Sequence, residues 1–396
     1  LNGAFLTADL FNLFVFFEVL LAASYGLLLH GRGAGQRQRL QAAVHYVTFN
    51  LAGSSLFLIA LGLLYGVTGT LNMADLAHKL PVLPPGDVRL AQVAALLLLT
   101  VFAVKAALLP LYFWLPDTYA AASAPVGALF AIMTKVGVYA VLRVTTLVFG
   151  AEVAAPFLSL LALATLALAA VGALAATRLR GLVAYLVVAS AGTLLLAAGL
   201  GSEGTLAAGL FYLINSTLVA AAWFLLADRI AAARGGSDLL QPRPLGGGWA
   251  LPGAAFFVAA VAVAGVPPLA GFMGKALLLQ AAGPLPMGPW VVAGVLASSL
   301  AVMVALARAG SVIFWKSAQV GAAAPDASPA HATALAGVLA AVLALAAAAG
   351  PISAYTGAAA GQLLQRQGYI DAVLGARPAP AAWDVRKEMR ERGDAK

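Results

Sequence analysis

The sequence predicts an all-α integral membrane protein, a polytopic helical bundle, and two observations lead to that fold class, while a third limits its chemistry. Of the 396 residues, 62% are hydrophobic and only 10% are charged, whereas a typical soluble domain is about 25% charged. Apolar runs of roughly 20 residues, the length that crosses a bilayer as a helix, recur along the chain. Cysteine is absent, which excludes disulfides, iron–sulfur clusters and thiolate zinc sites. Together these features exclude a soluble enzyme, a nucleic-acid-binding protein and a disordered scaffold, despite the formal net charge of +8.

Ten apolar segments are expected to cross the membrane, separated by short polar or Gly/Pro-rich connections. They lie at residues 6–29, 42–66, 90–115, 126–148, 156–176, 181–200, 204–227, 252–282, 290–314 and 332–349. A weakly amphipathic Ala-rich stretch and a charged tail, PAAWDVRKEMRERGDAK, follow. The chain starts inside an apolar run without a basic region or cleavage site, so we expect no signal peptide and a preceding segment.

Basic residues fall mainly on one side of the expected membrane, which predicts the orientation. Alternate connections collect Arg32, Arg37, Arg39, Arg178, Arg180, Arg229, Arg234, Arg243, Arg308 and Lys316 on that side. The opposite side collects Lys79, Arg89 and Arg143. Because basic residues accumulate in cytoplasmic loops, the first set is expected to be cytoplasmic. The side of the basic tail, which begins near Arg366, is left open.

Four charged residues lie well inside the apolar spans, away from their ends: Glu18, Lys105, Lys135 and Lys275. A charged side chain at mid-membrane costs about 2.5–3.5 kcal/mol on insertion scales, so each needs a reason to be there. One alternative is structural, with ion pairs between helices or lysines that extend to the interface. Glu18 is too deep to reach the interface, and three lysines cannot all pair with one glutamate. The favoured interpretation is ion or proton translocation.

Proline interrupts two of these spans close to a lysine. Pro110 follows Lys105 in FAVKAALLPLYFWLP, and Pro267 and Pro268 precede Lys275 in VAGVPPLAGFMGK. Proline removes a backbone donor and clashes with the preceding turn of a helix. A broken membrane helix is tolerated where the backbone is buried in protein or lines a watery cavity. Paired broken spans in two halves of a chain are typical of transporters with inverted repeats.

Lysine is suited to carry protons through such a path. The pKa of a lysine in water, about 10.4, falls on desolvation and rises again beside a carboxylate. Polar side chains on neighbouring spans are candidates for a relay that holds the connecting waters, although each taken singly also fits a helix–helix hydrogen bond. The candidates are His45, Thr48, Asn50, Ser54, Thr134, Tyr185, Ser190, Tyr212, Asn215, Ser216 and Thr217. The four histidines show no ligand spacing, so neither a metal site nor a cofactor is expected.

Three stretches of the chain resemble a known family. They are NGAFLTADLFNLFVFFEVLLAASYGLLLHG, HYVTFNLAGSSLFLIALGLLYGVTGTLNMADLA and FAVKAALLPLYFWLPDTYAAASAPVGALFAIMTKVGVYAVLRV. They closely resemble the D subunit of the Mrp multisubunit Na+/H+ antiporter, whose wider family includes antiporter-like membrane subunits of respiratory complex I. The resemblance implies about fourteen helices, of which about ten are present here. It also implies two inverted five-helix repeats with one broken helix in each.

The resemblance also implies roles for the four charged residues. Glu18 matches the family's glutamate, and Lys105 matches the lysine of the first broken helix, so these two are expected to form a switching pair. Lys135 is expected to bridge, and Lys275, on the second broken helix, to open toward one side. Complex I relatives usually carry His or Lys in the helix that here reads FYLINSTLVAAAWFLLAD, where this chain has Asn215. The link from Lys135 to Lys275 is therefore expected to use water and hydroxyls.

These inferences define a domain division, a function and partners. Residues 1–150 are expected to hold the rest of the first repeat, 151–320 the second repeat, and 321–396 the last helix and the tail. The function expected is proton translocation in a multisubunit monovalent cation/proton antiporter, a secondary transporter rather than an enzyme, in the bacterial inner membrane. The expected partners are other membrane subunits, the lipid bilayer, protons and Na+, with no nucleic acid. The alternatives are a proton-pumping membrane subunit of complex I or a membrane-bound hydrogenase, and a purely structural subunit.

Overall fold

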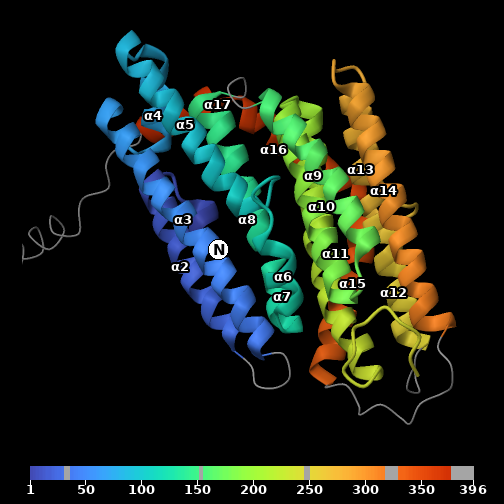
Figure 1. Cartoon of the computed structure of the whole chain (residues 1–396). Coiled ribbons are helices and arrows are strands. Elements are labelled where there is room, and N and C mark those ends of the chain that lie inside the picture. Colours follow the sequence, from blue (N-terminus) through green and yellow to red (C-terminus); the bar gives the residue numbers. More distant parts are fainter. Residues whose placement is uncertain (31–35, 151–154, 245–249, 317–328, 376–396) are drawn as a thin grey trace, which may run out of the picture.

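A computed structural model shows helices throughout the described parts of the chain, which are residues 1–30, 36–150, 155–244, 250–316 and 329–375. No strand occurs in these ranges, where two isolated antiparallel bridges, Asp9 to Asn72 and Arg178 to Leu239, are the β-type pairings. The helices run side by side as one elongated bundle (Figure 1). The expected all-α polytopic bundle is confirmed.

In the first half of the described chain, side-chain caps formed by Asp9 and Asn72 start two of the helices. They are α1 (Asn2–Leu6), α2 (Leu10–Leu29), α3 (Gln36–Thr68), α4 (Met73–Lys79), η1 (Leu80–Val82), α5 (Pro85–Ala106), α6 (Trp114–Ala121), α7 (Ala124–Phe130), α8 (Met133–Arg143) and the π-helical η2 (Val144–Phe149). Asp9 caps α2 by accepting from the backbone N–H groups of Phe11 at 2.8 Å and Asn12 at 2.9 Å. Such caps satisfy backbone donors that the first helical turn leaves unpaired.

Helices of the second half include one of 31 residues and a pair with a sharp bend. They are α9 (Ala155–Ala175), α10 (Leu179–Leu200), α11 (Glu203–Ala233), α12 (Ala250–Ala264), α13 (Ala270–Ala282), α14 (Gly288–Gly310), the π-helical η4 (Ser311–Trp315), α15 (Pro329–Ala347), α16 (Ala349–Leu364) and α17 (Arg366–Leu374). The α15 and α16 helices meet at an angle of 79°. The stretch beyond Gly350 therefore forms a helix that changes direction within the bundle.

Eight described helices are long and apolar enough to cross a membrane, or nine if the bent α15–α16 pair is one span. Ten spans were expected, and the difference lies in segment 252–282. That segment is split into α12 and α13, and neither piece reaches the length of a full span. The segment expected at 90–115 likewise ends its first helix at Ala106.

Contacts at the helix ends show which residues share one end of the bundle. Arg180 at the start of α10 forms an ion pair with Asp228 near the end of α11 at 2.6 Å. Arg308 of α14 donates to the backbone oxygen of Ala176, just after α9, at 3.0 Å. These residues therefore share one end of the bundle, the end predicted to be cytoplasmic.

The other end of the bundle carries α4 and α17 (Figure 1). Arg366 lines a cavity together with Arg143, which belongs to the basic-poor set. The chain up to residue 375 thus returns to the end opposite to Arg180. Two expectations lie outside the described residues: Arg32 in its loop, and the charged tail beyond residue 375.

Candidate functional site

Glu18 and Lys105 lie on either side of two neutral side chains of α3. The hydroxyl of Ser54 donates to the half-buried Glu18 carboxylate. The Lys105 ammonium, in a side chain only 5% exposed, donates to Asn50 Oδ1 at 3.1 Å. The Asn50 amide is oriented by its own Nδ2, which donates to the backbone oxygen of Tyr46 at 2.8 Å. The structure thus brings the expected pair together without a direct ion pair in the described part of the chain.

The first helix break fixes the position of Lys105. The α5 helix ends one residue after Lys105, and Ala107 takes a left-handed conformation with φ of 58°. Backbone groups freed by the break find side-chain partners: Trp114 Nε1 donates to the Val104 oxygen, and the Leu109 N–H donates to Thr165 Oγ1, both at 2.9 Å. A helix C-terminus carries partial negative charge, which favours an ammonium there. The break therefore stabilises a buried cation beside α3.

Lys135 of α8 is fully buried and also has a neutral partner. Its ammonium donates to Ser190 Oγ of α10 at 2.8 Å, and that hydroxyl donates to the Val187 oxygen at 2.7 Å. Two residues along α8, Gly137 packs against the first break, where a Cβ would lie 2.6 Å from the Ala106 nitrogen. The Lys135 helix and the Lys105 break are therefore in backbone contact.

Lys275 binds the open end of the second broken helix. The α12 helix ends at Ala264, and the partly buried Lys275 ammonium donates to the backbone oxygens of Val263 at 3.2 Å and Ala264 at 3.0 Å. A third bond, of 2.9 Å, reaches Ser299 Oγ of α14. Gly265 has a φ of +80°, and a Cβ there would lie 2.7 Å from Lys275 Cδ. Glycine at this position thus lets the lysine approach the break.

A small cavity of about 10 Å³ lies between α10, α11 and the end of α12. Ser190, the partner of Lys135, lines one part of it, and Val263, whose oxygen accepts from Lys275, lines another. Asn215 also lines it, with 1% exposure and an Oδ1 atom that has no hydrogen-bond partner in the described structure. A buried polar oxygen of this kind is usually satisfied by water.

Of the other candidates for the polar relay, some line this cavity and others do not. Tyr212 and Ser216 line the same cavity as Asn215. The Thr217 hydroxyl donates to the Leu213 oxygen of its own helix at 2.8 Å, and His45 is exposed on α3. The structure therefore gathers part of the predicted set around one cavity and leaves His45 and Thr217 outside it.

Sequence reasoning missed Ser299, which binds Lys275, and it missed Trp114 and Thr165, which bind backbone groups at the first break. Trp114 stands in the quoted motif FAVKAALLPLYFWLP, where an indole N–H near a broken helix was the available signal. Ser299 and Thr165 lie on distant spans, and no local pattern connects them to Lys275 or to Pro110. The described residues contain no group of three or more His, Asp or Glu side chains that could hold a metal ion.

Comparisons with known proteins agree with one another. Residues 7–301 match the family model described as NADH:quinone oxidoreductase/Mrp antiporter, TM. The chain is 41% identical to the D subunit of a probable K+/H+ antiporter of Rhizobium meliloti (strain 1021), over 95% of this chain and 75% of that protein. It is 38% identical to the D subunit of the Na+/H+ antiporter of Bacillus subtilis (strain 168), over 94% of this chain and 75% of that protein. The Mrp complex structure from Dietzia sp. DQ12-45-1b contains a chain with a TM-score of 0.82 and 30% identity, over 94% and 77%.

Proposed function

The chain belongs to the NADH:quinone oxidoreductase/Mrp antiporter family of membrane proteins, and from that premise we propose that it carries protons in a monovalent cation/proton antiporter. It is a multi-pass membrane protein, like its bacterial relatives. One relative is named for K+ and another for Na+. We therefore propose a monovalent cation as the exchanged ion, with Na+ as the first to test. The proposed partners of the chain are other membrane subunits, and the proposed complex is a secondary transporter without redox chemistry.

The observation that carries the proposal is that three intramembrane lysines each bind neutral acceptors. Lys105 binds an amide, Lys135 a hydroxyl, and Lys275 carbonyls and a hydroxyl. A buried lysine locked to a carboxylate is held in its charged form, whereas neutral acceptors allow both protonation states. Such lysines suit groups that take up and release a proton in turn.

We propose that the path runs from Glu18 to Lys275 across the bundle. Protonation of Glu18 would remove the negative charge nearest Lys105, so the two groups would influence each other through Ser54 and Asn50 without direct contact. From Lys105 the path continues to Lys135, whose helix contacts the first break. The proposed division into two repeats, with one broken helix in residues 1–150 and one in 151–320, places a lysine at each break.

The link from Lys135 to Lys275 is proposed to be a water in the cavity beside Asn215. About 10–15 Å³ of space for water centres suffices for one molecule, and this cavity offers about 10 Å³. Ser190 and Asn215 supply polar partners on opposite helices. Because Asn215 does not titrate, it would orient the water rather than carry the proton itself.

The test uses the assembled antiporter in inside-out vesicles with a fluorescent pH-gradient probe. We expect Lys105→Ala to abolish the gradient dissipation that Na+ or K+ causes, because the titratable group is lost, while the complex still assembles. Lys79→Ala is the matched control, since Lys79 is an exposed lysine that pairs with Asp75 at 3.0 Å outside the path. Normal antiport by the Lys105 variant would contradict the proposal.

A second candidate function is the membrane arm of a redox-driven complex, which the family's description includes. The two candidates differ in their partners, so absorbance spectra of the purified native complex separate them. Flavin or iron–sulfur absorbance would favour the redox complex, and its absence together with cation-driven antiport favours the antiporter. A purely structural role for the charges predicts lost assembly in Glu18→Gln, whereas the proposed role predicts lost transport with assembly intact.

A further inference from the structure

Two large cavities meet at Arg366, away from the proton path. One, of about 550 Å³, lies between α8, η2, α16 and α17, and its lining includes Arg143, Arg366 and Tyr369. The other, of about 540 Å³, lies between η1, α5 and η2. Thr146 and Arg366 line both. Each has the size of a ligand site, typically 300–1,000 Å³.

The charge in this region is unbalanced. Arg143 and Arg366 are both partly buried, and neither forms an ion pair within the described ranges. Arg143 Nε is buried without a hydrogen-bond partner there. The Arg143 guanidinium lies 4.2 Å from the ring centroid of Tyr369, a cation–π contact that holds it in place. No acidic residue is among the described lining of either cavity.

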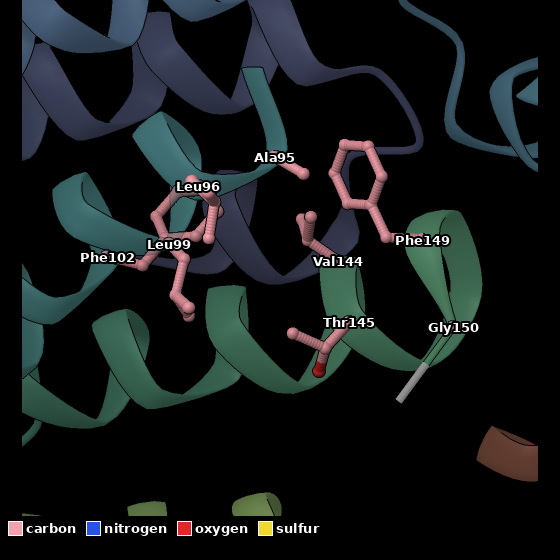
Figure 2. A pocket seen from close by; sticks show the side chains of 8 residues that line it. All are labelled: Ala95, Leu96, Leu99, Phe102, Val144, Thr145, Phe149 and Gly150. Atoms are coloured by element: carbon pink, nitrogen blue, oxygen red, sulfur yellow. The ribbon is translucent and has the colours of Figure 1, made fainter. Parts of the chain in front are cut away.

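The remaining lining is mainly apolar and continues into the membrane-spanning part of α5. A narrow apolar groove shares Ala95, Phe149 and Gly150 with the second cavity and extends along Leu99 and Phe102. Figure 2 shows its side chains coming from α5 on one side and from residues 144–150 on the other. The cavities are lined by residues of η1 and α17, and the end of the bundle that carries α4 and α17 is seen in Figure 1. The site therefore combines a cationic centre near the membrane interface with apolar channels beside it.

We propose that this site binds an anionic diacyl phospholipid, with its phosphate at Arg143 and Arg366 and its acyl chains in the apolar cavities and the groove. Arginine is suited to phosphate because its planar fork donates two parallel hydrogen bonds. Basic pockets between membrane helices bind acidic lipid headgroups on the same principle. A soluble anion would satisfy the arginines but would leave the apolar lining uncovered. A zwitterionic lipid would cover the apolar lining but would bring its own cation beside the arginines.

The test measures lipid retained by the intact, detergent-purified complex by native mass spectrometry. The complex is exchanged into micelles that contain phosphatidylglycerol and phosphatidylcholine in equal amounts. The variant is Arg143→Gln with Arg366→Gln. The matched control is Arg89→Gln, an exposed arginine in the first turns of α5 that lines neither cavity.

We expect the wild-type complex and the Arg89 variant to retain phosphatidylglycerol in preference to phosphatidylcholine. At about fivefold per basic residue, the double variant should bind phosphatidylglycerol roughly 25-fold more weakly, with phosphatidylcholine retention unchanged. Because only complexes of full mass are scored, misassembly does not mimic the result. Equal phosphatidylglycerol retention by the double variant and the wild type would overturn the proposal, as would displacement of the lipid by millimolar inorganic phosphate.

Discussion

The contact between Gly137 and the first helix break offers the sharpest test of how Lys105 is positioned. In Gly137→Ala, the added methyl would lie 2.6 Å from the Ala106 nitrogen and 2.7 Å from the Lys105 carbonyl carbon. Ordinary contacts begin near 3.4 Å, so α8 and the break must separate by about 0.8 Å to relieve the shorter contact. Both atoms belong to the backbone, so no flexible side chain can move aside. The steric cost of such overpacking is about 1–3 kcal/mol, which exceeds the gain of about 1 kcal/mol from alanine in a helix.

The consequence for Lys105 follows from its hydrogen bond to Asn50, which is 3.1 Å long. A shift of about 0.8 Å along that direction would stretch it beyond hydrogen-bonding length. A misplacement of about 1 Å at a reacting centre costs up to about 100-fold in rate. We therefore expect Gly137→Ala to lower antiport at least tenfold.

The assay is cation-induced dissipation of a pH gradient in vesicles, scaled to the amount of assembled complex. Gly62→Ala on α3 is the matched control, since a methyl there meets nothing within 4 Å in this chain. The control should transport normally. If Gly137→Ala transports as well as Gly62→Ala, the α8 contact does not position Lys105 and the reasoning is refuted.

Three further predictions concern the second half of the path and the orientation. Ser299→Ala should lower antiport about tenfold, because a hydrogen bond to a charged group contributes about 1.5–3 kcal/mol. Ser298→Ala should leave antiport unchanged, because in the described structure that hydroxyl bonds to Val295 of its own helix. Equal transport by both variants would contradict the role of Ser299. Asn215→Leu should abolish antiport, because the proposed water link loses its partner at this position. The melting temperature of the complex should stay level or rise, because an unpaired buried amide oxygen is replaced by an apolar group. Retained antiport would exclude the proposed water link. A cysteine at position 232, at the end predicted to be cytoplasmic, should react in intact cells only with a membrane-permeant maleimide. A cysteine at position 86, at the opposite end, should also react with an impermeant maleimide. The reverse pattern of labelling would show that the predicted orientation is inverted.

The fold class could be predicted from sequence because apolar length and rare charges are local properties. The helix breaks could also be predicted from sequence, since Pro110 and the Pro267–Pro268 pair cannot continue a hydrogen-bonded helix. In each case the helix ends a few residues before the proline, at Ala106 and Ala264. Local chemistry therefore predicts where each lysine meets an open helix end.

Which polar side chains meet which lysine could not be predicted, because it depends on the rotation of each helix about its own axis. A helix that is apolar on all sides carries little signal of its buried face. On α3, His45 and Asn50 were equal candidates, yet the structure exposes the first and buries the second against Lys105. The family resemblance pairs Glu18 with Lys105, but it does not indicate that Ser54 binds the first and Asn50 the second.

The three bonds of Lys275 have a consequence for what happens when it loses its charge. An ammonium has three donors, and the described structure supplies three acceptors: the carbonyls of Val263 and Ala264, and the hydroxyl of Ser299. The neutral amine keeps two donors and gains a lone pair. A carbonyl can only accept, but a hydroxyl can reverse its direction and donate to that lone pair. Rotation of the Ser299 hydroxyl about its C–O bond would then keep every hydrogen-bond partner satisfied. Lys275 could therefore lose its proton while the two carbonyls at the end of α12 keep their hydrogen bonds.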